Sequence, residues 1–164
     1  MPVTPKDLLL NHLEYTFEKE AWQPSLAMAV RGLTAEQAAW KPGRERHSIW
    51  QIVRHVLRWK HATLEAWDGT HPLFLGKPTT HALDLERTDW QEAAGDDGVR
   101  HADVKALDEL SRRIKERIQM MDADAVRRAF PGEEMPAVLR VLRMATHDAY
   151  HAGQIRYIRG LQGA

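Results

Sequence analysis

Apolar residues recur at intervals of three and four along almost the whole chain, which is the spacing of one face of an α-helix. The clearest run lies between residues 101 and 121, where charged residues separate the apolar positions Val104, Leu107, Leu110, Ile114, Ile118 and Met121. No segment alternates apolar and polar residues for long enough to predict a β-strand. The pattern therefore predicts an all-α protein.

The first half of the chain carries clear signals for the ends of helices. Thr4 followed by Pro5 predicts the start of a helix, and Pro24 predicts that this helix is interrupted or kinked there. Two more starts are predicted by capping boxes, in which Ser or Thr lies three positions before Gln. These pairs are Thr34 with Gln37 and Ser48 with Gln51. They predict a short helix over 34–40 and a long one over 48–67.

Two more long helices are predicted in the second half, after a segment with the composition of a loop. Residues 70–100 contain Pro and Gly at loop density, with room for one short helix from Thr88. The apolar run described above predicts a helix over 101–121. Pro136 predicts the first turn of a last long helix, which is expected to end at Gly160.

Four long amphipathic helices without strands predict a four-helix bundle that forms a single domain over residues 1–164. About 30 residues join the second long helix to the third, which is too many for a tight turn between antiparallel neighbours. We therefore expect this long connection between helices 2 and 3 to cross over the bundle or to cover one of its ends.

Composition and charge exclude several classes of function. Lys and Arg together number 23, and so do Asp and Glu, so the net charge gives no reason to expect a nucleic acid or an anionic membrane as partner. No apolar run is long enough for a membrane span, and the first residues lack the order of a signal peptide, so we expect a cytoplasmic protein. Cysteine is absent, so any thiol chemistry must use a thiol from outside the chain.

Three histidines lie on apolar helix faces and are candidate metal ligands. His147 and His151 are four residues apart on the last helix, so their side chains project from the same face and can bind one ion together. His55 lies on the apolar stripe of the second long helix and supplies a third ligand. On spacing alone the alternative stays open that these are core histidines that form hydrogen bonds in the interior.

Two segments, "HSIWQIVRHVLRWKHATLEAW" and "ATHDAYHAGQIRYIRG", resemble the DinB/YfiT-like family of small bacterial four-helix bundles, as does the opening "WQPSL…LTAEQAAWKP". In that family one histidine from the second helix and two from the fourth bind a divalent metal. The resemblance implies His55, His147 and His151 as ligands, with Zn or Ni as the expected ion among those that suit imidazole nitrogens. Gln154 matches the family's "GQI" and is expected to orient a ligand, with an ordinary interhelical hydrogen bond as the alternative.

The resemblance also implies an enzymatic activity. Some members of the family use the metal to activate low-molecular-weight thiols such as bacillithiol or mycothiol, and others bind metal without a determined activity, some in connection with DNA damage or stress. We therefore expect a metal-dependent transferase that joins a small-molecule thiol to a small electrophile, with a non-catalytic stress protein as the alternative. Hydrolysis by metal-bound hydroxide ranks lower, because no carboxylate base is apparent on the histidine face. Dimers common in the family, together with six Trp residues, predict a homodimer.

Five other residues close to the histidines in sequence receive weaker interpretations. Asp148 is expected to be a surface carboxylate. Tyr150 is expected to be a packing residue, with donation of a proton to a substrate as the alternative. His47 is expected to lie outside the site, with reach to its mouth as the alternative. Arg140 and Arg143 are expected to be solvated, with contact to a carboxylate of the thiol as the alternative.

Overall fold

The computed structural model describes residues 3–70, 90, 92–122, 124–132 and 134–164. Within these ranges the chain is helical and forms no strand, only one isolated bridge between Ala129 and Pro136. The α-helices are α1 (Pro5–Leu13), α2 (Leu26–Val30), α3 (Ala35–Ala39), α4 (Ile49–Trp67), α6 (Asp97–Met120) and α7 (Ala137–Gln162). A π-helical turn, Glu14–Glu18, extends α1, and a short 3₁₀ turn, Ala125–Arg127, precedes α7. The predicted all-α bundle is confirmed.

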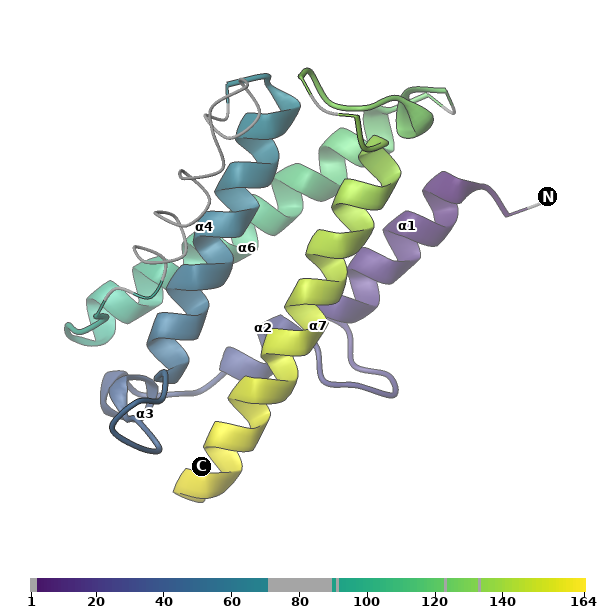
Figure 1. The fold of residues 1–164 in the computed structure, drawn as a ribbon. Helices are drawn as coiled ribbons and strands as arrows, with labels where there is room; N and C mark the ends of the chain where they lie inside the picture. The colour runs from purple at the N-terminus through teal and green to yellow at the C-terminus, as the bar shows by residue number, and fades with distance from the viewer. Residues whose placement is uncertain (1–2, 71–89, 91, 123, 133) are drawn as a thin grey trace.

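Helices α4 and α6 lie side by side and run in the same direction (Figure 1). Near the start of both helices, Trp50 Nε1 donates a hydrogen bond to Asp103 Oδ2 at 2.7 Å. Near their other end, Arg117 Nη1 donates to Asp68 Oδ1 at 2.6 Å. The end of α4 and the start of α6 therefore lie at opposite ends of the bundle.

This parallel arrangement decides how the two helices are joined. Because α4 ends and α6 begins at opposite ends of the bundle, the described residues agree with the predicted crossover between the second and third long helices. Most of this connection, including the predicted short helix from Thr88, lies outside the described residues.

Capping boxes predicted the starts of α3 and α4 correctly. The Ser48 side chain accepts a hydrogen bond from the Gln51 backbone, and the Gln51 side chain accepts one from the Ser48 backbone. The first helix, by contrast, was predicted to continue to Pro24 and ends earlier, since the backbone is already extended at Lys19. Proline favours an extended residue before it, so the chain has to leave the helix before Pro24 is reached.

Two other predicted helix boundaries are wrong, and in both cases the helix includes a glycine that was expected to lie outside it or at its end. The third long helix starts at Asp97, four residues earlier than predicted, because the Asp96 side chain accepts a hydrogen bond from Val99 N and caps the helix. The last helix continues through Gly160 and stops at Gly163, where the backbone is left-handed with φ of 70°. Glycine inside a helix costs only about 1 kcal/mol, which packing of the remaining face can offset.

Two apolar clusters fill the bundle, and α4 and α7 contribute to both. The first includes Val56, Leu107 and Ile155, and the second includes Leu64, Ile114 and Val141. Between these clusters the interface of α4 with α7 carries polar side chains, which form the site described below. None of the helices in the described part of the chain is long and apolar enough to cross a membrane.

Candidate metal centre

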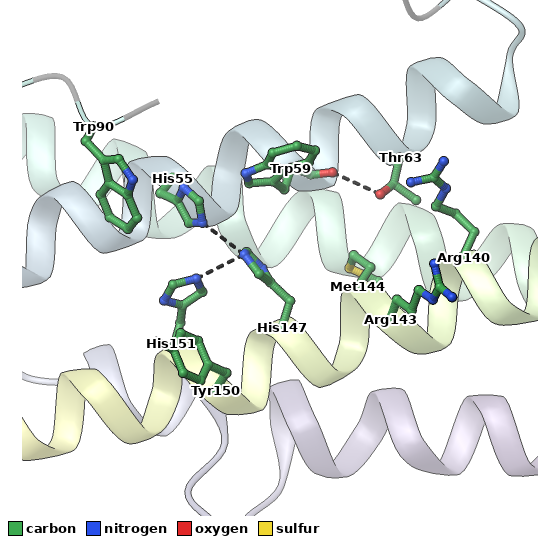
Figure 2. Close-up of a pocket in the computed structure, with 10 residues that line it drawn as sticks. All are labelled: His55, Trp59, Thr63, Trp90, Arg140, Arg143, Met144, His147, Tyr150 and His151. Carbon is green, nitrogen blue, oxygen red and sulfur yellow. Dashed lines mark hydrogen bonds between the residues drawn. The ribbon is translucent and has the colours of Figure 1, made fainter. Parts of the chain in front are cut away.

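The three candidate histidines meet between α4 and α7 (Figure 2). The two helices are antiparallel there, which brings His55 of α4 opposite both histidines of α7. His147 Nε2 lies 2.9 Å from His55 Nε2 and 3.0 Å from His151 Nε2. His55 and His151 are 7% and 3% exposed, and His147 is half-buried. The structure therefore brings together the three residues that the sequence singled out.

Gln154 determines which nitrogen of His151 carries the hydrogen. Its Oε1 lies 2.7 Å from His151 Nδ1, while its Nε2 donates to the Tyr150 hydroxyl at 2.9 Å. Because the amide oxygen can only accept, His151 donates from Nδ1 and keeps a lone pair on Nε2. This lone pair points at the other two histidines, as a metal ligand requires.

The two short spacings, from His147 Nε2 to His55 Nε2 and to His151 Nε2, are compatible with a shared cation. Nitrogens bound to one ion at about 2.1 Å are about 3.0 Å apart when their bonds meet at a right angle and about 3.4 Å apart in a tetrahedron. Hydrogen bonds alone explain the geometry less well, because an imidazole nitrogen carries either one hydrogen or one lone pair. A hydrogen on His147 Nε2 can serve His151 or His55 but not both, whereas one cation can accept lone pairs from all three.

Stacked rings form one wall of the centre. The indole of Trp90 stacks on His55 with ring centroids 4.2 Å apart and an interplanar angle of 7°. On its other face Trp90 stacks on His47, with centroids 3.8 Å apart. Partial burial is the main cause that lowers the pKa of His47. His47 thus contacts Trp90 but is not among the residues that line the pocket described next.

A pocket of about 470 Å³ opens onto the three histidines, a volume in the range of small-molecule sites. Besides the histidines its walls are Trp59, Thr63, Trp90, Arg140, Arg143, Met144 and Tyr150. Figure 2 shows the histidines together at one side of this set and the two arginines at the other, with Trp59 and Met144 between them. The centre is therefore open to a ligand from one direction.

Comparison with protein families gives a match to the DinB superfamily over residues 19–155. The chain belongs to the DinB superfamily. The matched range includes all three histidines and ends just after Gln154. Comparisons with curated proteins and with solved structures found no match. For this DinB-superfamily bundle, the family and the clustered histidines together support a possible three-histidine metal site.

The sequence interpretation of Asp148 was wrong. In this DinB-superfamily bundle Asp148 is 0% exposed, and its Oδ2 accepts a hydrogen bond of 2.5 Å from the ammonium of Lys60, which is 1% exposed. Burial raises the pKa of the Asp148 carboxyl, and the charge of Lys60 acts in the opposite direction. Asp148 lies about 100° around the helix from His147. That side of α7 faces the interior of the bundle, where Lys60 of α4 lies opposite Asp148.

Sequence reasoning also missed or misjudged three other parts of the site. Tyr150 was expected to be a packing residue, but it is exposed, lines the pocket and accepts a hydrogen bond from Gln154. Arg143 was expected to be solvated and, although exposed, lines the pocket with Arg140. Trp90 received no role, since it lies in a connection whose path no local pattern predicts.

Proposed function

We propose that His55, His147 and His151 bind one divalent metal ion, Zn or Ni, and that the protein is a transferase that joins a low-molecular-weight thiol to a small electrophile. The observation that carries this proposal is the pocket that leads to three converging imidazole nitrogens. A structural metal site is closed by protein ligands, whereas a catalytic one keeps positions open to a substrate. Three protein ligands beside a pocket favour the catalytic kind.

The chain's own residues have distinct tasks in this proposal. A divalent ion bound by neutral imidazoles supplies a positive charge that lowers the pKa of a coordinated thiol. Gln154 keeps the Nε2 lone pair of His151 directed at the ion, and Trp90 holds the ring plane of His55 by stacking. Trp59 and Met144 give the pocket apolar walls that exclude water from the thiol. Since the chain has no cysteine, no sulfur of its own competes for the open position.

Cobalt substitution tests whether an external thiol reaches the ion. In the cobalt-loaded protein we expect bacillithiol, mycothiol, glutathione or coenzyme A to add a near-ultraviolet charge-transfer band, because a bound thiol is a thiolate at pH 7. Spectra are recorded during titration with each thiol and with its S-methylated form as control. If no thiol changes the spectrum, the transferase proposal is wrong and a non-catalytic metal site replaces it.

A homodimer is proposed as the assembled form. An exposed stripe of large apolar side chains runs along α7, at positions Leu139, Leu142, Tyr150, Tyr157 and Leu161. Exposed apolar side chains gathered on one helix face are common at interfaces between proteins, and a second copy would offer the same stripe. We expect light scattering to give about twice 18.8 kDa and the Tyr157→Glu variant to give a monomer. A monomer of the unaltered protein at micromolar concentration would contradict the proposal.

A further inference from the structure

The pocket has a strongly uneven distribution of charge. Arg140 and Arg143 line the end away from the histidines, and none of the ten lining residues in the described part of the chain carries a carboxylate. A cavity bordered by charge of one sign concentrates ligands of the opposite sign. A metal ion on the histidines would add to this positive charge. The ligand of this pocket is therefore expected to be an anion.

The distance between the two ends indicates the length of that ligand. Arg143 lies four residues before His147 on the same helix, and Arg140 lies seven residues before it. At a rise of 1.5 Å per residue these separations are about 6 Å and about 10 Å along the axis of α7. Both arginines and His147 line one pocket, so a single molecule can contact both ends.

The wall between the two ends is apolar. Trp59 of α4 and Met144 of α7 lie between the histidines and the arginines (Figure 2). The hydroxyl of Thr63 donates to the Trp59 carbonyl at 2.9 Å, so this polar group is already bonded within α4. The middle of a ligand would meet an indole and a thioether, which favour carbon chains or rings over charged groups.

We infer that the ligand is an elongated small molecule with a metal-binding atom at one end, an apolar middle, and a carboxylate or phosphate at the other end, bound by Arg140 and Arg143. Guanidinium groups pair with both kinds of anion through two parallel hydrogen bonds. The metal-binding end of this inference rests on the proposed function, whereas the arginine end does not.

A matched pair of thiols tests the inference on the cobalt-loaded protein. 6-Mercaptohexanoate and 6-mercaptohexan-1-ol share the thiol and the carbon chain and differ in the charged end. We expect the charge-transfer band to give a dissociation constant about tenfold lower for the carboxylate, the effect of one charge-assisted hydrogen-bonded pair. 6-Mercaptohexyl phosphate, as a third probe, shows whether phosphate or carboxylate is the preferred anion.

Variants assign this preference to the two arginines. The double variant Arg140→Gln/Arg143→Gln is expected to lose the tenfold preference while its affinity for the neutral thiol stays the same. Arg156→Gln, which removes an exposed arginine of α7 outside the pocket, is expected to keep the preference. Equal binding of the two thiols by the unaltered protein, or an unchanged preference in the double variant, would overturn the inference.

The two proposals fail in different ways. If no probe changes the cobalt spectrum, the thiol-binding part of the proposed function fails, and the arginine end is then measured on metal-free protein by calorimetry. Hexanoate and hexyl phosphate are compared there with neutral hexanamide, in the unaltered protein and in the double variant. Tighter binding of an anion that depends on the arginines supports the inference, and equal binding of all three compounds overturns it.

Discussion

Replacing His151 by alanine is expected to lower the affinity for the metal ion by more than about 100-fold. Loss of a partner outside the coordination shell costs about 10–100-fold, and loss of a ligand costs more because one of three coordinating nitrogens disappears. The same result is expected for His55→Ala and His147→Ala, since the Nε2 atoms of His55 and His151 both lie next to that of His147. Elemental analysis of protein purified without a histidine tag gives the metal content of each variant.

The control for this experiment is another histidine of α4. His61 is exposed and lies outside the cluster, so His61→Ala should retain its metal. A second measurement separates metal loss from unfolding. Free metal at 100 times its dissociation constant stabilises a protein by about 2.7 kcal/mol, so added metal should raise the melting temperature of the unaltered protein and of His61→Ala only. Full metal content in His151→Ala would refute the assignment.

Replacing Asp148 by alanine is expected to lower the free energy of unfolding by about 3–5 kcal/mol, the usual cost of removing one partner from a buried ion pair. The reason is the ammonium that stays behind. Lys60 is 1% exposed, and its remaining near neighbours include the sulfur of Met144 at 3.5 Å and the ring of Phe17, whose centroid is 5.0 Å away. None of these neighbours carries a negative charge. Urea denaturation with a chelator present measures the effect without any contribution from metal.

Two further variants test whether the unpaired ammonium of Lys60 causes this loss of stability. The double variant Lys60→Met/Asp148→Leu removes both charges and is expected to recover most of the lost stability, because apolar pairs of similar volume often replace buried ion pairs at no cost. Glu116→Ala breaks an exposed contact with Arg112 on α6 and should have little effect. The explanation would be wrong if Asp148→Ala destabilised the protein no more than Glu116→Ala does.

Sequence predicted the fold well where local chemistry decides it. The capping boxes at Thr34 and Ser48 fixed two helix starts because their hydrogen bonds involve only neighbouring residues. The apolar stripe of the third long helix predicted its buried face, including Leu107 and Ile114. Gly160 was misjudged because the effect of a glycine depends on what packs around the helix, which the sequence alone does not describe.

The candidate site was predictable only in part. His147 and His151 belong to one helix, so their spacing places them together, whereas His55 was proposed from the apolar stripe of another helix and from a family resemblance. The roles of Asp148 and Trp90 depend on which residues of other elements lie opposite them. The ion pair with Lys60 spans 88 positions of the chain, and the stacking of Trp90 on His55 spans a crossover, so no local pattern reveals either contact.

The division of the histidines between α4 and α7 has a consequence for how the protein is made. His55 and His147 are 92 positions apart, and the ribosome adds about 5–20 residues per second, so roughly 5 to 18 s pass between their syntheses. Throughout that interval His55 is a lone imidazole on a growing chain. The proposed three-histidine site is therefore complete only once α7 has been made and packs against α4.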